Sequence, residues 1–108
     1  MAFKLNLTGK FTRKNIVIEL MNERGAWEKN TLDATYLQPT TDELDELRDL
    51  KPKEVLERNL TGVAGLLDDA GNSIELTPEH KVALLAIPAA VLALSRAFWE
   101  GVVKSPKA

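Results

Sequence analysis

The sequence of 108 residues predicts an α+β domain in which antiparallel strands come first and helices fill the C-terminal half. In the first 37 residues apolar and polar side chains alternate, which is typical of strands with one buried face. After Pro39 apolar residues recur every three or four positions, which is typical of a helix with one buried stripe. A chain of this length is expected to form a single domain over residues 1–108.

The strands are expected between about residues 3 and 37. Phe3–Leu7, Asn15–Leu20 and Leu32–Leu37 each place apolar side chains on one face of an extended chain. Residues 8–14 are expected to connect the first two strands. Asn22–Gly25 is typical of a turn, because Asn and Gly adopt the backbone angles that tight turns require.

Helices are expected at about residues 41–60 and 78–103. Thr40 and Glu43 have the spacing of a capping box, so a helix should begin directly after Thr40. Pro52 breaks that segment or opens a second short helix. In the second segment Thr77 is the expected N-cap, and Pro88 should kink the helix or divide it in two.

A short hairpin is expected before the last helical segment. Val63–Leu67 and Ser73–Leu76 flank Asp68–Asn72, a run of turn-forming residues. The acidic residues of this turn do not match a calcium loop, because Ala70 and Ser73 stand where that loop needs an oxygen ligand and a glycine.

The composition argues against enzymes and nucleic-acid binders. Fourteen basic and 16 acidic residues give a net charge of −2, which does not attract a phosphate backbone. With no cysteine and one histidine, His80, we expect no catalytic residues, no cofactor and no metal. The acidic run Asp42–Asp49 has the spacing of a solvated helix face. The N-terminus lacks the apolar run of an export signal.

The segment Val82–Ser95 contains fourteen residues without a charge. A membrane-spanning helix needs about 20 apolar residues, so contact with protein is expected instead. The segment has two apolar faces, which favours contact with another chain, although a helix wrapped by its own domain is an equal alternative. The side chains expected to contact a partner are Leu84, Ile87, Val91, Leu94, Phe98 and Trp99.

The order of motifs from Leu32 onward resembles the tail assembly chaperones of long-tailed bacteriophages. It comprises the acidic, Leu-rich helix start at Thr40–Leu47, the Gly62–Gly71 hairpin, the Leu-Leu-x-x-Pro segment at Leu84–Pro88 and the aromatic segment at Ala97–Glu100. The sequence departs from the family pattern at the hairpin, where Ala64–Leu66 separates Gly62-Val63 from the turn.

The resemblance implies a viral or prophage protein that is not an enzyme. It implies a chaperone that binds the tape measure protein, shields its apolar helices and keeps it soluble while the tail tube assembles. It also implies a homo-oligomer in the host bacterial cytoplasm that is absent from the mature virion. A frameshifted long form would recruit the tail tube protein. Nucleic acid and membrane are not expected partners.

Two other functions stay open on the sequence. One is a structural virion component, such as a head-tail connector or a tail tube accessory protein. The other is a small regulatory or enzyme-accessory domain that binds through the acidic surface of Asp42–Asp49.

Overall fold

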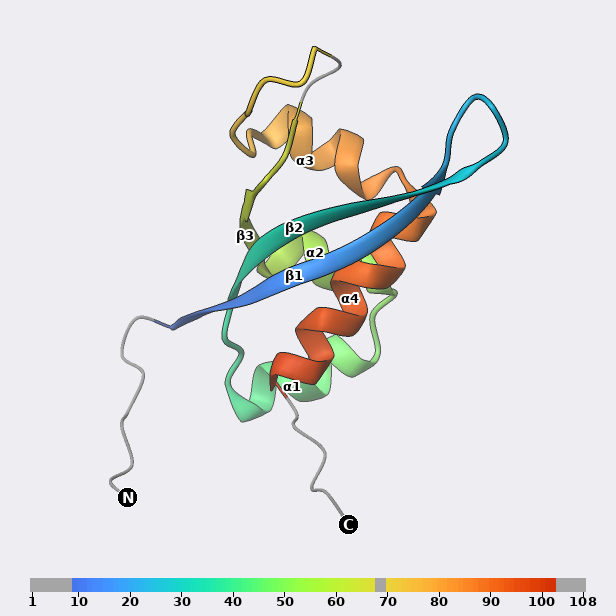
Figure 1. Cartoon of the computed structure of the whole chain (residues 1–108). Coiled ribbons are helices and arrows are strands. Elements are labelled where there is room, and N and C mark those ends of the chain that lie inside the picture. Colours follow the sequence, from blue (N-terminus) through green and yellow to red (C-terminus); the bar gives the residue numbers. More distant parts are fainter. Residues whose placement is uncertain (1–8, 68–69, 103–108) are drawn as a thin grey trace, which may run out of the picture.

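A three-stranded antiparallel sheet lies against a group of helices, which confirms the predicted α+β class (Figure 1). The computed structural model describes residues 9–67 and 70–102, so the predicted strand at Phe3–Leu7 lies outside the described residues. The elements are β1 (Lys10–Met21), β2 (Trp27–Leu37), α1 (Thr41–Arg48), α2 (Pro52–Asn59), β3 (Leu60–Ala64), α3 (Pro78–Leu85) and α4 (Pro88–Val102).

β1 is longer than predicted, because it also includes residues 10–14, where a connection is expected. Arg13 pairs with Ala34 and Ile16 pairs with Leu32, so β1 holds one extra residue between these two pairs. Asn15 takes up this residue as a β-bulge with φ of 57°, a left-handed conformation that Asn tolerates better than most residues.

The bulge decides which side chains of β1 face the helices. Side chains alternate along a strand, so Phe11 and Arg13 share the inner face before the bulge. One extra residue moves the inner face from odd to even positions. After the bulge the inner face is therefore apolar, with Ile16, Ile18 and Leu20.

β2 is the central strand of the sheet, in the order β1-β2-β3. It begins at Trp27, five residues before the predicted start at Leu32. β3 pairs with β2 only from Asp33 to Tyr36, so it covers only the C-terminal part of β2. Within the described residues the predicted hairpin is small: an isolated bridge joins Leu67 to Ser73, and the Ile74 amide donates to the Leu66 carbonyl at 2.9 Å.

The helix boundaries follow the predicted caps. Glu43 N–H donates to the Thr40 hydroxyl at 3.3 Å, and the Glu43 carboxylate accepts from the Thr40 amide at 3.0 Å, which completes the capping box. Thr77 caps α3 in the same way through its hydroxyl. Pro88 divides the last segment into two helices that are bent by 102°.

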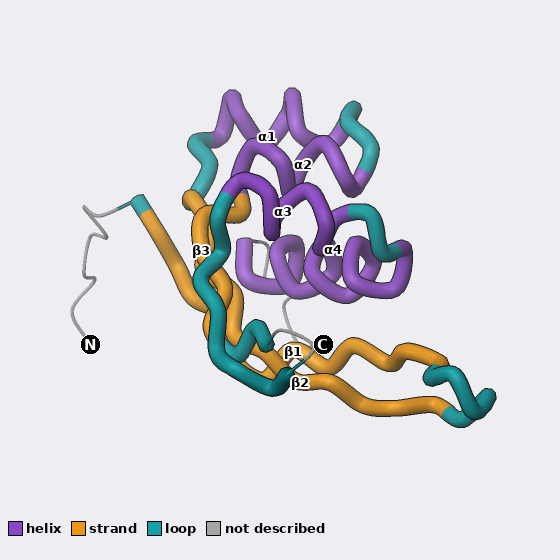
Figure 2. Tube along the Cα trace, turned by 90° about the horizontal axis from the view of Figure 1, so that it is seen from above, coloured by secondary structure: helices purple, strands orange, loops and turns teal. Residues whose placement is uncertain are grey.

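α4 occupies the centre of the molecule. It packs against β1 on one side and against α2 and α3 on the other, and Figure 2 shows the helices gathered on one side of the strands. Phe98 of α4 lies in an aromatic cluster with Phe11 and Tyr36, with ring centroids 6.0 and 5.4 Å away. This cluster fixes the helix to the sheet.

Candidate functional site: an apolar groove beside β2

Three of the six predicted partner-contacting residues are buried in the core of their own chain. Leu94 and Phe98 are fully buried, and Leu84 is 7% exposed. Leu94 and Phe98 contribute to the packing between α4 and the sheet, so their side chains do not face a partner in this fold. Partner contact through these two residues stays a prediction that the buried positions in this fold do not favour.

The other three predicted residues, Ile87, Val91 and Trp99, are half-buried and pack against the core. The bend between α3 and α4 explains the difference from prediction. A straight apolar helix would leave one of its two faces uncovered, whereas the bend brings most of these apolar side chains against other elements of the domain and leaves Val82 and Leu92 exposed. The structure thus favours the alternative in which the domain wraps its own apolar helix.

A groove of about 390 Å³ brings together Leu84 and Ile87, two of the predicted contact residues. It lies between the hairpin of β1 and β2, the chain after β3, and the corner where α3 meets α4. Its lining residues are Ile18, Leu20, Lys29, Asn30, Thr31, Leu32, Gly65, Leu66, Leu67, Leu84, Ile87 and Ala90. Most of these side chains are apolar, so the groove suits an apolar ligand surface.

One wall of the groove is a strand edge without a neighbour. β3 ends at Ala64, opposite Asp33, so within the described residues β2 has no strand beside Trp27–Leu32 on that side. Gly65 follows with φ of +91°, a conformation that glycine adopts without strain. A Cβ at Gly65 would lie 3.5 Å from the Cα of Leu32, so the chain passes close to β2 as it turns toward the groove. Gly65 covers the edge at Thr31 and Leu32, so we call the side of Trp27–Asn30 that faces away from β1 the free edge of β2.

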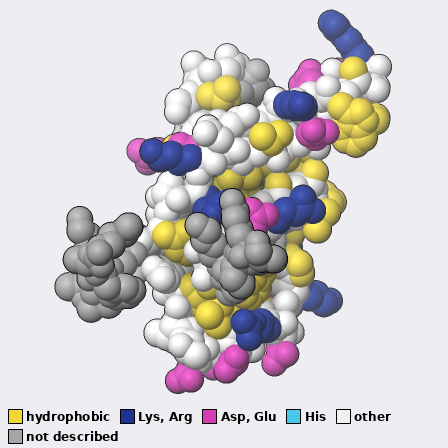
Figure 3. All heavy atoms as spheres, turned by 60° about the horizontal axis from the view of Figure 1, so that its bottom comes forward, with side chains coloured by type: hydrophobic (Ala, Val, Ile, Leu, Met, Phe, Trp, Pro, Cys, Tyr) yellow, Lys and Arg dark blue, Asp and Glu magenta, His cyan; other side chains and the backbone are white. Residues whose placement is uncertain are grey.

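The hairpin of β1 and β2 extends beyond the helices (Figure 2). Met21 and Trp27, near its end, are exposed apolar side chains. Met21 pairs with Trp27 there, and Trp27 is 66% exposed. Hydrophobic side chains are visible at this end of the molecule in the upper right of Figure 3. The end of the hairpin is therefore a second apolar surface, next to the free edge of β2.

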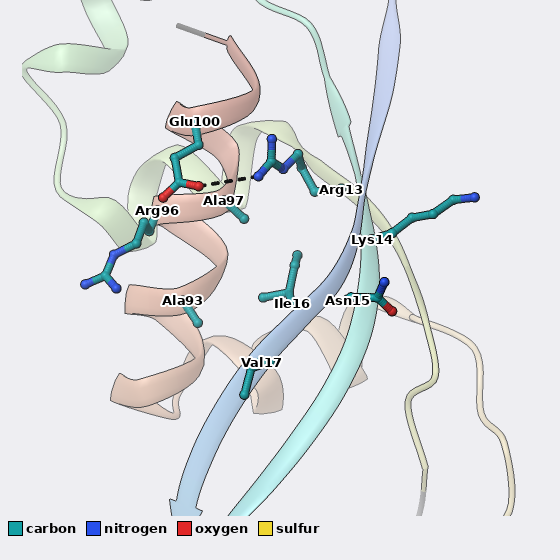
Figure 4. A pocket seen from close by; sticks show the side chains of 9 residues that line it. All are labelled: Arg13, Lys14, Asn15, Ile16, Val17, Ala93, Arg96, Ala97 and Glu100. Atoms are coloured by element: carbon teal, nitrogen blue, oxygen red, sulfur yellow. Dashed lines mark hydrogen bonds and ion pairs between the residues drawn. The ribbon is translucent and has the colours of Figure 1, made fainter. Parts of the chain in front are cut away.

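A second groove, of about 190 Å³, runs between β1 and α4 (Figure 4). Arg13 and Glu100 form an ion pair across it at 3.4 Å. Figure 4 shows that Arg96 points away from Arg13 and that Lys14 points to the opposite side of β1. The cationic groups do not converge, so this groove does not form an anion site.

The described residues do not assemble a catalytic or metal centre. His80 lies in the first turn of α3, where Nδ1 bonds the carbonyl oxygen of Glu75 and no nucleophile stands beside it. Carboxylates of α1 are used in the cap at Thr40 and in ion pairs with Arg48 and Arg58. Among residues 9–67 and 70–102 no group of three metal-ligating side chains occurs. The acidic turn residues Asp68 and Asp69 lie outside the described residues.

Sequence reasoning missed three parts of the groove: Leu66 and Leu67, the inner face of the hairpin, and the free edge of β2. The edge depends on where β3 stops, and that boundary has no marker except Gly65.

Within the described residues no single helix is long and apolar enough to cross a membrane. α3 and α4 reach that length and composition only as a bent pair.

Comparison with models of protein families, with curated protein sequences and with solved structures gave no match to this chain.

Proposed function

We propose that this chain is a non-enzymatic tail assembly chaperone that binds the tape measure protein and keeps it soluble during assembly of the tail tube. The motifs from Thr40 to Glu100 support this proposal by their resemblance to that family. The observation that carries it is the apolar groove at Leu84 and Ile87, which opens beside the free edge of β2.

The groove offers a physical basis for chaperone activity. Apolar side chains of an unassembled client attract one another in water, and burial lowers their free energy by about 25 cal/mol per Å². Leu67 and Ile87 provide apolar contacts of this kind. A chaperone of this kind has to release the client when tube subunits arrive, because it is expected to be absent from the finished virion.

The remaining parts of the proposal follow the family resemblance. The protein would act in the host bacterial cytoplasm as a homo-oligomer, and a frameshifted long form would recruit the tail tube protein. The alternative is a structural virion component, such as a head-tail connector or a tail tube accessory protein. Mass spectrometry of purified particles separates the two, because the chaperone should be missing from them and a structural component should be present.

Co-expression with the tape measure protein tests the groove directly. Leu67 lines the groove and is 58% exposed, so Leu67→Asp should leave the fold intact and place a charge at the binding surface. Leu92 on α4 is 62% exposed and does not line the groove, which makes Leu92→Asp a matched control. We expect the soluble fraction of the tape measure protein to fall with Leu67→Asp and to stay at the wild-type level with Leu92→Asp.

Two outcomes would contradict the proposal. If the wild-type chain does not raise the soluble fraction of the tape measure protein, the chaperone function is wrong. If Leu67→Asp and Leu92→Asp solubilise it equally well, the groove is not the binding site. Circular dichroism of both variants shows whether the fold is retained.

A further inference from the structure

We infer that two copies of this chain associate through the outer face of the sheet, which points away from the helices. The inference deepens the homo-oligomer of the proposed function, on which it rests for the expectation that copies associate, and it adds the contact surface and the symmetry. The outer face consists of Lys14, Val17, Glu19 and Met21 of β1 and of Trp27, Lys29, Thr31 and Asp33 of β2.

The alternation of side chains along the two strands defines the outer face. After the bulge the buried side chains of β1 stand at even positions, as they do in β2, so the odd positions point away from the helices. Val17, Met21 and Trp27 stand at odd positions and are 48%, 56% and 66% exposed. Exposed apolar side chains that gather on one face mark a contact with another protein.

The charges of the outer face form two rows across the strands. Glu19 pairs with Lys29, and Asp33 stands opposite the bulge, where its carboxylate accepts from the Asn15 amide at 2.9 Å. Lys14 is the basic side chain at the bulge, and Figure 4 shows it on the side of β1 that faces away from α4. Each row has one acidic and one basic side chain, with the acid on β1 in one row and on β2 in the other. In the part of the chain that the structure describes, neither Glu19 nor Lys29 forms an ion pair.

This charge pattern is complementary to itself. A two-fold axis that runs between β1 and β2, parallel to the strands, places β1 of one copy over β2 of the second copy and keeps each row over the same row. Glu19 then faces Lys29 of the second copy, and Lys14 faces Asp33. Two sheets with aligned strands pack face to face in this way in β-sandwiches.

The apolar end of the outer face selects this axis over another. An axis across the strands at Val17 would also bring unlike charges together, but it would place Trp27 over Thr35, which is polar. With the axis parallel to the strands, Met21 meets Trp27 of the second copy, and a thioether and an aromatic ring attract each other. Tryptophan is enriched among the residues that contribute most to binding at protein interfaces. The axis parallel to the strands therefore matches apolar with apolar as well as acid with base.

Other partners fit the outer face less well. The apolar side of a client helix would bury Glu19 and Lys29 without opposite charges, and an unpaired buried charge costs free energy. A phosphate backbone would meet Glu19 and Asp33 beside the lysines, and like charges repel. A second copy supplies each of these charges with its opposite and covers the apolar end of the face.

Charge reversal tests the contact, because two variants can complement each other. In Glu19→Lys both charged side chains of this row are basic, and in Lys29→Glu both are acidic. Each variant alone places like charges over like charges twice in the dimer, so we expect self-association about tenfold weaker than in wild type. In a mixture the basic row of one variant lies over the acidic row of the other, which restores both pairs. We expect a heterodimer with about the wild-type dissociation constant in sedimentation velocity and native mass spectrometry.

Two exposed apolar positions separate the outer face from the rest of the surface. Met21→Asp should weaken the dimer about tenfold, since it places an unpaired carboxylate beside Trp27 of the second copy. Leu92 of α4 is 62% exposed and does not belong to the outer face, so Leu92→Asp is the matched control and should associate like wild type. Circular dichroism of every variant shows whether the strands and helices are retained.

Three results would overturn the inference. If the wild-type chain stays monomeric up to about 1 mM, there is no such contact, and the chaperone function stands if the monomer solubilises the tape measure protein. If wild type dimerises and both charge variants associate equally well, the copies meet through another surface. If the variants lose self-association and do not complement each other, the axis does not run parallel to the strands.

Failure of the proposed function is a separate outcome. A wild-type chain that dimerises with the expected complementation and does not solubilise the tape measure protein supports the contact and contradicts the chaperone function.

Discussion

The hydroxyl of Tyr36 donates a hydrogen bond to the main-chain carbonyl of Leu94, with 2.8 Å between the two oxygens. It links the central strand of the sheet to the middle of α4, between residues 58 positions apart in the sequence. Both side chains are fully buried. Burial raises the pKa of the Tyr36 hydroxyl well above its ordinary value, and the nearby Arg13 guanidinium opposes this effect.

Tyr36→Phe should lower the free energy of unfolding by about 1 kcal/mol, because it removes this hydrogen bond and leaves the ring in place. The raised pKa also predicts a pH dependence. The folded state keeps the Tyr36 proton at a pH at which the unfolded chain releases it. The contribution of the hydroxyl to the free energy of unfolding is therefore fully present below the unfolded pKa of about 10 and is lost as the pH rises further.

Urea unfolding of both proteins at neutral and alkaline pH measures this effect. Wild type should lose more stability than Tyr36→Phe between neutral pH and about pH 11. Equal losses in the two proteins would show that the Tyr36 hydroxyl does not control the alkaline transition. Other groups titrate in both proteins, so the difference between the two curves isolates the hydroxyl.

Gly101 lies where the last turn of α4 crosses β1. A Cβ at this position would come within 2.6 Å of Cε2 of Phe11, closer than side chains pack. We expect Gly101→Ala to destabilise the protein by about 1 kcal/mol, since the overpacking outweighs the higher helix propensity of alanine. Gly62→Ala is the control, because its Cβ would lie 3.9 Å from the Cβ of Thr35, an ordinary contact. Equal melting temperatures for wild type and Gly101→Ala would contradict the expected clash.

The capping box of α1 predicts an acid-sensitive contribution to stability. Hydrogen bonds from the Thr40 amide and hydroxyl lower the pKa of Glu43. A lowered pKa means that the contribution is present above the unfolded pKa of about 4.3 and is lost as the pH falls through the folded pKa. Stability should therefore decrease less for Glu43→Gln than for wild type between neutral pH and about pH 3.

Thr40→Ala examines the other half of the same box. It should cost about 1 kcal/mol at neutral pH, since the amide of Glu43 loses its hydroxyl acceptor. Chemical denaturation measures the free energy of unfolding of Thr40→Ala and of Glu43→Gln. A Glu43→Gln protein with the acid sensitivity of wild type would mean that other carboxylates account for the decrease.

Lys81 of α3 holds the end of α2. Its Nζ donates to the carbonyl of Glu57 at 2.9 Å and to that of Leu60 at 2.8 Å, and partial burial lowers its pKa. Lys81→Met keeps the length of the side chain and removes both hydrogen bonds, so we expect a loss of about 1–2 kcal/mol. Lys53→Met, at an exposed position of α2, should change the melting temperature little. Similar effects of the two substitutions would contradict a capping role for Lys81.

The sequence was sufficient where a local signal decides the structure. Thr40 with Glu43, Thr77 with Pro78, and Pro88 each fix a helix end through short-range hydrogen bonds or the missing proline amide, and the structure confirms all three. The turn near Asn22 is also confirmed, with the Asn22 side chain accepting from the amides of Arg24 and Ala26.

Long-range packing decided what the sequence could not predict. Lys10–Lys14 has the composition of a loop, yet Phe11 pairs with Tyr36 and draws this segment into β1. The beginning of β2 is exposed, so Trp27–Asn30 lacks the buried alternation that marks a strand. The direction of the bend at Pro88 decides which apolar side chains are covered, and this explains why Leu94 and Phe98 belong to the core.

The bulge at Asn15 also determines where the chain can change in length. Loss of a single residue between Arg13 and Ile16 would turn the apolar side chains of the following segment outward and the polar ones inward, whereas an insertion at the Asn22–Gly25 turn would leave both faces as they are. Natural variants and engineered fusions should therefore differ in length at the hairpin tip, and the residue count between Arg13 and Ile16 should stay constant.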